Sequence, residues 1–425
     1  MQNLAYGFSL VFQPFTFALM TFGVVIGIII GALPGLTASM GIILLLPLVY
    51  RLPANVSLVM LCGLFCGGMY GGSISGILLN TPGTPSASAT TLDGYPLNRQ
   101  GKAGKALGIA TIASFGGGII STICLIVIAP ELARVALSFQ AADYFALSIF
   151  GLSIMASSSG KNVVKGLIAG AIGLLVSCVG IDTIVGVNRL TFNNMYLAGG
   201  FSLLPVLIGV FAVSEVLKQV QTSHEERPVT IQAVTDILPT WKEVKGVIPA
   251  ILVGGVLGVF IGIVPGTGGA IACFLAWNVV SKFDKEGHKF GTGVLAGVAA
   301  PESANNATTG GALIPMLCLG VPGDVVTSVM LGALVLIGVR PGPLLFIENL
   351  DVVYSIFSGM IIIQFMMLGF GLLSSRYSPA ILKIPDTLLM PIIMVLCVVG
   401  AFCLNNSLYD VTVALVFGIL GFFMK

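Results

Sequence analysis

The stretch NTPGT, Asn80–Thr84, interrupts an apolar run that begins at Val56. Proline has no amide donor and clashes with the carbonyl group four residues earlier, and glycine weakens a helix further. The Pro-Gly pair therefore predicts that a helix ends here. Backbone groups freed at membrane depth are tolerated only where protein or a water-filled cavity satisfies them. A plain proline kink or a surface loop is the alternative, because Gly and Pro are common in membrane helices.

The composition around this stretch is that of a membrane protein. Of the 425 residues, 56% are hydrophobic and 8% are charged, whereas soluble domains are roughly 25% charged. About ten to twelve apolar stretches approach the length of a membrane span. They are solid runs without period-2 alternation, which predicts helices and not a barrel. The fold class expected is an all-α polytopic membrane protein.

Several other classes are disfavoured by the same residues. Arg51 is the first basic residue, so the basic start of a removable signal peptide is missing and we expect the first apolar stretch to remain as a span. The net charge of +2 and the absence of a basic tract argue against nucleic-acid binding. The eight cysteines lie in apolar surroundings, and we expect them to pack as small apolar residues.

Pro-Gly breaks occur four times, in two pairs. GALPGLTAS begins at Gly31 and GIVPGTGGA at Gly262, and GVPGD at Gly320–Asp324 repeats the pattern of NTPGT. Paired breaks in one membrane chain are typical of secondary transporters built from internal repeats. We therefore predict two structural repeats with broken helices and re-entrant hairpins.

The spacing of the breaks supports this division. Pro34 and Pro82 are 48 residues apart, and Pro265 and Pro322 are 57 residues apart. The excess of nine residues equals the length of the polar run SKFDKEGHK at residues 281–289. Basic residues are spread over both halves, as inverted copies would spread them, so we predict inverted repeats. We expect residues 1–217 to form the first half, 218–245 a polar linker and 246–425 the second half.

Each break offers groups that bind ions. A half-helix that begins after a break points unpaired amide groups into the gap, which suits an anion. Carbonyl oxygens released before the break, together with Asn and Thr oxygens, suit a hard cation such as Na⁺. After NTPGT, the dipeptide Asp93-Gly94 is a turn signal in an expected interfacial loop.

The richest polar cluster is PESANNATTGG, Pro301–Gly311. Such polarity near membrane depth is costly unless it is used. Asn305 and Asn306 offer amide nitrogens to a carboxylate and carbonyl oxygens to a cation. Glu302 has two readings: it binds a coupling ion or a proton, or it caps the first turn of a helix that begins at Pro301.

These blocks resemble a known family, the large membrane subunit of the tripartite tricarboxylate transporters. The resemblance is carried by GALPGLTASMGIILLLPL, GGSISGILLNTPGTPSASATTLDGYP, RQGKAGKALGIA, GIVPGTGGAIA, APESANNATTGGALIPMLCLGVPGD and GVRPGP. It implies uptake of citrate-like or other carboxylates across the bacterial inner membrane, with a periplasmic solute-binding protein and a small membrane subunit as partners. It also implies a mobile transport domain, and a further apolar segment beyond Lys425, so we expect the second half to be truncated.

We predict that a di- or tricarboxylate binds between the two sets of breaks, with Na⁺ or H⁺ as the coupling ion and no other cofactor. The predicted substrate-binding residues are Asn80, Thr81, Pro82, Gly83, Thr84, Ser303, Asn305, Asn306, Pro322 and Gly323. The predicted ion-binding residues are Pro34, Gly35, Thr37, Pro265, Gly266, Thr267, Glu302 and Asp324.

Three alternatives stay open at this point. A passive channel for organic anions would be expected to show rings of charge, which the sequence lacks. An intramembrane enzyme needs a nucleophile with a base, and Ser303 beside Glu302 is the pair to test. GxSxG, HExxH and Walker A motifs are absent from the sequence, so we expect no enzyme. A purely structural subunit would transport normally after Asn80→Ala or Asn305→Ala.

Overall fold

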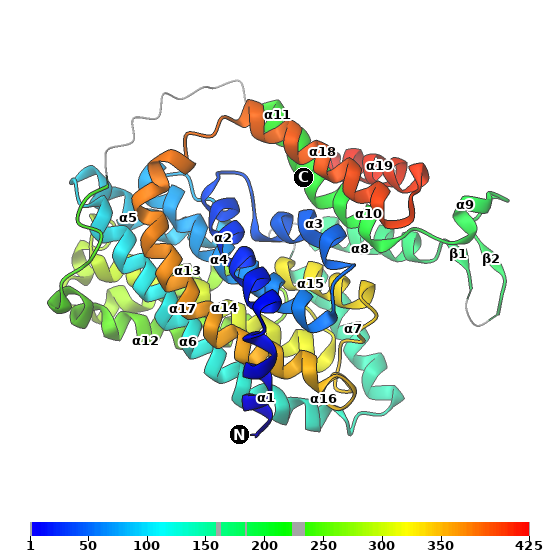
Figure 1. Cartoon of the computed structure of the whole chain (residues 1–425), viewed down its shortest axis with the longest axis horizontal. Coiled ribbons are helices and arrows are strands. Elements are labelled where there is room, and N and C mark those ends of the chain that lie inside the picture. Colours follow the sequence, from blue (N-terminus) through cyan, green and yellow to red (C-terminus); the bar gives the residue numbers. More distant parts are fainter. Residues whose placement is uncertain (1, 159–162, 183–184, 223–233, 425) are drawn as a thin grey trace. The chain divides into compact units, whose positions relative to one another are not determined.

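The structure, a computed structural model, describes residues 2–158, 163–182, 185–222 and 234–424. Its regular elements are helices except for two short strands, β1 (Gly180–Ile181) and β2 (Asn188–Arg189), which pair antiparallel (Figure 1). Among the described residues, six helices are long and apolar enough to cross a membrane, and six shorter apolar helices accompany them. The prediction of a polytopic helical membrane protein is confirmed.

The elements of the first half run from α1 to α11. They are α1 (Gln2–Val11), α2 (Pro14–Ala32), α3 (Ala38–Val49), α4 (Ala54–Leu79), η1 (Pro85–Ala87), α5 (Ser88–Arg99), α6 (Ala103–Ala136), α7 (Ala141–Ser158), α8 (Val163–Ser177), β1, β2, α9 (Met195–Ala198), α10 (Leu203–Leu207), η2 (Ile208–Val213) and α11 (Ser214–Thr222).

The elements of the second half run from α12 to the last described residue. They are α12 (Trp241–Ile263), α13 (Gly268–Phe283), η3 (Gly287–Lys289), α14 (Leu295–Leu319), α15 (Val325–Leu336), α16 (Leu345–Glu348), α17 (Leu350–Ile381), α18 (Asp386–Asn405) and α19 (Leu408–Met424).

The order of helices repeats around the four Pro-Gly pairs. In the first half a long helix (α2), a short one (α3), a long one (α4), a short one (α5) and a long one (α6) follow one another; α12, α13, α14, α15 and α17 repeat this order. A 12-residue helix such as α3, α5 or α15 is about 18 Å long at 1.5 Å per residue, too short to cross a ~30 Å hydrocarbon core. This order agrees with two repeats that each contain half-helices; their inverted orientation stays a prediction.

The packing groups the chain into two compact units. The large unit comprises residues 1–42, 49–138 and 227–384, and the small unit comprises residues 43–48, 139–226 and 385–425. These units do not follow the two sequence halves, since both halves contribute to each. The halves themselves stay a prediction.

The structure describes the two ends of the predicted linker. Helix α11 continues to Thr222 and α12 already begins at Trp241, so both ends of the 218–245 segment are helical. Thr240 and Glu243 form a capping box that starts α12, and this local signal sets the helix start before the apolar run. The segment 223–233 lies outside the described residues.

Glycines bring the long helices of the large unit into backbone contact. Cβ atoms built on Gly23, Gly27 and Gly31 of α2 would lie 2.2–2.4 Å from carbonyl oxygens of α4. On α12, Gly254 and Gly258 meet α14 in the same way. Small residues four positions apart let membrane helices approach this closely. Close packing matters in a membrane because an apolar side chain gains no hydrophobic free energy by leaving lipid for another helix.

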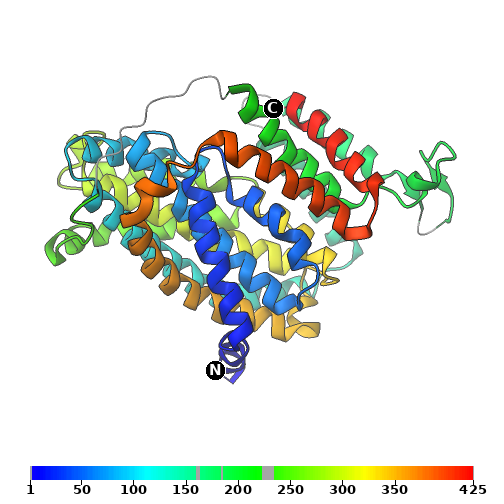
Figure 2. The same cartoon turned by 45° about the horizontal axis from the view of Figure 1, so that its top comes forward.

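The two halves also exchange partners inside the large unit. Helix α4 packs against α2 and α17, and α14 packs against α12 and α6 (Figures 1 and 2). Each central helix therefore contacts the last long helix of the repeated series in the other half. Both central helices are buried along almost their whole length. The repeat therefore places α4 and α14 at the core of this unit, where their polar groups are shielded from lipid.

Candidate functional site

The first half brings its two breaks together. Helix α4 ends at Leu79 and is capped by Asn80, which has φ 58°, a left-handed conformation that Asn tolerates better than most residues. The chain then turns back so that Gly83 N donates to Gly72 O at 3.1 Å. A Cβ atom on Gly83 would lie 2.0 Å from the carbonyl oxygen of Gly31. Only glycine fits there, and NTPGT therefore packs against the end of α2 that precedes LPGLT.

The second half repeats this arrangement. Gly266 N donates to Gly323 O at 2.9 Å, which joins VPGTG directly to GVPGD. A Cβ atom on Gly323 would lie 2.8 Å from Gly262 O, the counterpart of the Gly83–Gly31 contact. Each half thus forms one junction of two breaks from its own residues.

The hairpin after NTPGT, formed by η1 and α5, contacts the second half of the chain near the start of α13. A Cβ atom on Gly269, near the start of α13, would lie 3.0 Å from Ser86 Cβ and 3.4 Å from Thr308 Oγ1. Ser86 follows NTPGT in η1, and Thr308 belongs to α14. The segment after NTPGT, the start of α13 and the polar part of α14 therefore meet at one place.

The helix starts at the breaks differ in electrostatics. Asp324 caps α15, with Oδ1 accepting from Thr327 N and Thr327 Oγ1, each at 2.7 Å. A carboxylate already occupies this helix start, so it suits a cation better than the anion expected after every break. At α13, by contrast, Thr267 Oγ1 donates to Ile261 O at 2.6 Å and makes no capping bond. Of the starts of α13 and α15, the start of α13 can receive an anion.

The other predicted residues at the breaks are less enclosed. Asn80 and Thr81 are exposed, whereas Gly83 and Thr84 are buried. Pro34 and Gly35 form the turn between α2 and α3, and Thr37 Oγ1 pairs with Ser39 Oγ at 2.8 Å. Pro265 and Pro322 are partly buried. The predicted substrate and ion residues thus form two junctions plus one buried stretch of α14.

The buried stretch of α14 carries unpaired amides. Asn305 Nδ2 donates to Met69 O at 2.9 Å, but Asn305 Oδ1 and both amide atoms of Asn306 have no hydrogen-bond partner among the described residues. Both side chains are 0% exposed. Leaving such groups unpaired costs about 1–3 kcal/mol each, so the structure keeps polar groups here that its own folding does not use.

Gln364 on α17 belongs with these amides and was missed in the sequence, where it lies isolated in an apolar run. Its Oε1 also lacks a partner within the described chain, and it lies 2.1 Å from a Cβ atom built on Gly118. On α6, Gly117 contacts Ser303 and Ser121 contacts Gly310. Asn306 lies between Ser303 and Gly310 on α14, so it faces the same part of α6 as Gln364.

Glu302 does not cap a helix, so that reading is wrong. Helix α14 already begins at Leu295, and Glu302 lies in its second turn, 0% exposed. Its carboxylate accepts hydrogen bonds from Thr90 Oγ1 of α5 and from Ser114 Oγ of α6, the latter at 3.0 Å. Ser303 Oγ instead donates to Ile251 O at 2.6 Å. Ser303 and Glu302 therefore do not form the nucleophile–base pair that an enzyme would need.

Only one of the two central helices is polar at this level. When Pro82 is aligned with Pro322, the positions of Glu302, Asn305, Asn306 and Thr309 correspond to Cys62, Phe65, Cys66 and Met69 on α4. The two sets face each other, since Cys66 Sγ lies 3.7 Å from Thr309 Oγ1 and Asn305 bonds Met69 O. The repeat supplies two similar backbones, and the second half alone carries the polar chemistry.

Asp93 is a second residue whose role was misread. It does not form a turn: it lies inside α5, 0% exposed. Its Oδ1 accepts from the backbone N–H groups of Gly291, Gly293 and Val294 at 2.9–3.0 Å, and its Oδ2 accepts from Trp277 Nε1 at 2.8 Å. Four donors from the second half override the local turn signal. Asp93 thus ties the hairpin after NTPGT to the loop that starts α14.

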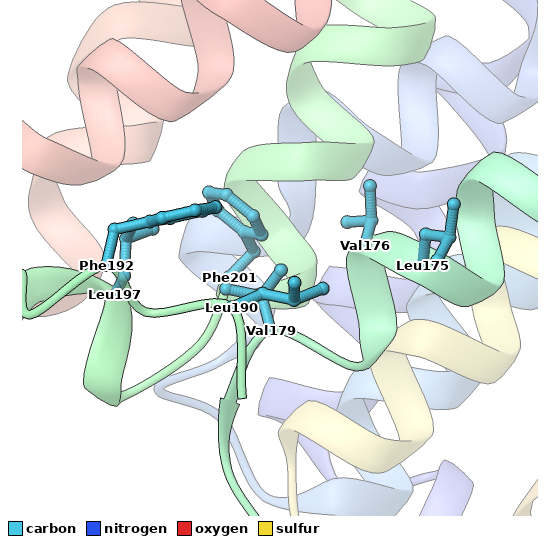
Figure 3. A pocket seen from close by; sticks show the side chains of 7 residues that line it. All are labelled: Leu175, Val176, Val179, Leu190, Phe192, Leu197 and Phe201. Carbon is cyan, nitrogen blue, oxygen red and sulfur yellow. The ribbon is translucent and has the colours of Figure 1, made fainter. Parts of the chain in front are cut away.

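A pocket in the small unit has a different character. It is lined by Leu175, Val176, Val179, Leu190, Phe192, Leu197 and Phe201 (Figure 3). This lining offers no polar group to orient a carboxylate, so the junctions and α14 remain the candidate site.

Comparison with known proteins agrees with the resemblance seen in the sequence. A family model described as "Tripartite tricarboxylate transporter TctA family" matches residues 17–425. The chain is 35% identical over 422 residues, 99% of its length, to an uncharacterized 52.8 kDa protein in the TAR-I ttuC' 3'region of Agrobacterium vitis, of which the match covers 84%.

A second relative is shorter. An uncharacterized protein in the TAR-II ttuC' 3'region of Agrobacterium vitis is 34% identical over 165 residues, which cover 39% of this chain and 68% of the relative. No solved structure matches the chain. Because the family model spans nearly the whole sequence, the chain belongs to the tripartite tricarboxylate transporter TctA family.

Proposed function

We propose that this chain is the large membrane subunit of an uptake system for di- or tricarboxylates, driven by a gradient of Na⁺ or H⁺. It works in the bacterial inner membrane with a small membrane subunit and a periplasmic solute-binding protein. Family membership supports the role in transport and the need for partner subunits. The observation that carries the substrate site is the set of unpaired, fully buried amides on α14 beside the break junctions.

The carboxylate binds at the polar stretch of α14, where two faces of the helix offer donors. Asn306 supplies amide N–H groups on the face toward α6. On the face where the hairpin after NTPGT and the start of α13 meet, Asn305 has one amide N–H left beside its bond to Met69 O, and the uncapped start of α13 supplies backbone N–H groups and the positive end of its dipole. Thr84 and Ser86, whose Oγ atoms lie 3.2 Å apart, supply hydroxyl groups from the hairpin. The junction at Asp324, whose carboxylate caps α15, suits the cation. These groups bind a carboxylate without a buried Lys or Arg.

An enzyme and a passive channel fit this arrangement less well. The Ser303 hydroxyl and the Glu302 carboxylate are engaged with different partners, which removes the pair that favoured hydrolysis. A coupled transporter accumulates substrate against the concentration gradient of that substrate when a gradient of the driving ion is present. A channel only lets the substrate equilibrate. That difference is measured directly in vesicles.

Asn306→Ala tests the site with little interference from folding. The Asn306 amide has no partner among the described residues, so the alanine substitution leaves no other group without a hydrogen bond. We therefore expect the melting temperature to stay the same or to rise. Uptake should fall about 10- to 100-fold, the equivalent of a hydrogen bond to a charged group of about 1.5–3 kcal/mol. The measurement is uptake of labelled citrate, malate and succinate into proteoliposomes holding the chain with its partner subunits under imposed Na⁺ and H⁺ gradients.

Asn278→Ala is the matched control, because Asn278 is an exposed residue of α13 in the same unit. It should transport like the native protein. Native-level uptake by Asn306→Ala would remove α14 from the substrate site. Asn80 needs a different substitution, since alanine at φ 58° adds backbone strain; Asn80→Gly removes the amide and keeps the conformation.

A further inference from the structure

Asp93 and Glu302 are both fully buried, but their hydrogen-bond partners differ in kind. Asp93 accepts from four N–H groups, and N–H groups can only donate. Glu302 contacts hydroxyl groups, those of Thr90 and Ser114 and also that of Ser73 on α4, and a hydroxyl can donate or accept. Asp93 therefore meets only donors, whereas Glu302 keeps its hydroxyl partners with or without a proton.

Within the part of the chain that the structure describes, no cation compensates Glu302. Among the described residues, none of the ion pairs involves Glu302. The ionisable groups that interact with it are Tyr70 on α4 and Cys273 on α13, and Asp93 lies one turn from Thr90 on α5. Helix α6 presents Ser114, and α12 contacts α14 through glycines. An ionised carboxylate in such a place is costly, so a positive charge must accompany it.

A row of hydroxyl groups leads away from Glu302. Ser114 and Thr111 lie one turn apart on α6, and Thr111 Oγ1 lies 2.8 Å from Tyr70 OH. Tyr70 OH lies 3.2 Å from Ser375 Oγ on α17. Six residues later α17 ends at Ile381, beyond the exposed Tyr377. Hydroxyl groups that both donate and accept can pass a proton along such a row where they are hydrogen-bonded. Between Ser114 and Thr111, which lie about 5 Å apart along the helix, the step needs a bridging water.

Glu302 is also next to the proposed substrate site. Asn305 and Asn306 follow it by one turn of α14, a rise of about 5–6 Å. An ionised Glu302 repels a bound carboxylate, and a protonated Glu302 does not. Proton binding and carboxylate binding must then strengthen each other, because such coupling is reciprocal.

We propose that Glu302 carries the proton that drives carboxylate uptake, and that Ser114, Thr111, Tyr70 and Ser375 connect it to the end of α17. This inference rests on the proposed transport function and names its coupling ion. Water at one membrane face gives a proton to the Glu302 carboxylate when substrate is bound. The same proton leaves to water at the other face after substrate release, and the carboxylate is restored.

The test uses proteoliposomes with the chain and its partner subunits, a pH dye in the lumen and labelled citrate, malate or succinate outside in Na⁺-free buffer. In the native protein, substrate addition should acidify the lumen, and an acid exterior should raise accumulation about tenfold or more. Glu302→Gln should lose this gradient-driven gain. It should still exchange labelled for unlabelled substrate within about threefold of the native rate, since glutamine resembles the protonated acid.

Two further variants test the row. Tyr70→Phe should slow proton-linked uptake about three- to tenfold and spare exchange, because one relay hydroxyl is lost. Thr122→Ala is its matched control: Thr122 is buried on the same helix as Ser114, and its hydroxyl bonds only Gly118 O of that helix, at 2.7 Å. It should leave both activities at the native level.

The outcomes separate the two proposals. Native protein that exchanges no substrate and accumulates none under either gradient contradicts the transport function itself. Native protein that exchanges substrate and accumulates it only with a Na⁺ gradient, with no change of lumenal pH, contradicts the role of Glu302 alone. This measurement on the native chain decides the question even where Glu302→Gln does not fold.

Discussion

Replacing Gly258 by leucine will lower the free energy of unfolding by about 3 kcal/mol or more, and folded protein will be recovered poorly. A Cβ atom at this position would lie 2.4 Å from Ala304 O and 2.8 Å from Ala304 Cα. Both are backbone atoms of α14, so the new side chain fits only if α12 and α14 separate. Separation would disrupt the helix that carries Glu302 and Asn306. Thermal unfolding in detergent and carboxylate uptake report the two effects.

Gly246 gives the matched control on the same helix. A Cβ atom there meets nothing within 4 Å, and the residue is exposed. Gly246→Leu should therefore stabilise the protein slightly, by up to about 1 kcal/mol, because leucine favours a helix over glycine. If both leucine variants melt alike, the close approach of α12 and α14 is not a stability determinant.

Removing the Asp93 carboxylate is expected to have the second large effect on stability. Asp93→Ala removes the acceptor of four N–H donors, one of them buried and three part-buried, and losing one side of a buried charged network costs up to about 3–5 kcal/mol. We expect a large fall in melting temperature and loss of both uptake and exchange together. That joint loss differs from Glu302→Gln, for which exchange should persist.

Graded substitutions sharpen this expectation. Trp277→Phe removes only the donor to Asp93 Oδ2 and should cost about 1.5–3 kcal/mol, a single hydrogen bond to a charged group. Asp351 lies in the exposed first turn of α17. Asp351→Ala should lower the free energy of unfolding by at most about 1 kcal/mol, the interaction of one carboxylate with the helix dipole. An Asp93→Ala protein as stable as the Asp351→Ala protein would show that the loop before α14 does not depend on Asp93.

The positions of the breaks were predictable because their causes are local. A Pro-Gly pair removes helix hydrogen bonds wherever it occurs, and helices end at Ala32, Leu79, Ile263 and Leu319 beside the four pairs. The repeat was predictable for the same reason, since it is a repeat of these signals. Whether the copies are inverted depends on the membrane, and the order of helices alone does not decide it.

The partners of individual polar groups were not predictable. Asp93-Gly94 reads locally as a turn, yet four donors from residues about 180–200 positions away hold Asp93 inside a helix. Pro301-Glu302 reads as a helix start, yet α14 begins earlier because it is packed along its length. Gln364 carries no sequence signal at all.

The sequence alone determined the class of protein, the four helix ends and the polar stretch on α14, because these follow from composition, from backbone chemistry and from residue type. Tertiary structure decided which groups meet. It joined the breaks within each half through glycines that no larger residue can replace. Among the described residues, it left both amide atoms of Asn306 and the Oε1 atom of Gln364 without a partner. It also gave Glu302 only hydroxyl partners. Such choices depend on contacts between residues far apart in the chain, which local sequence does not encode.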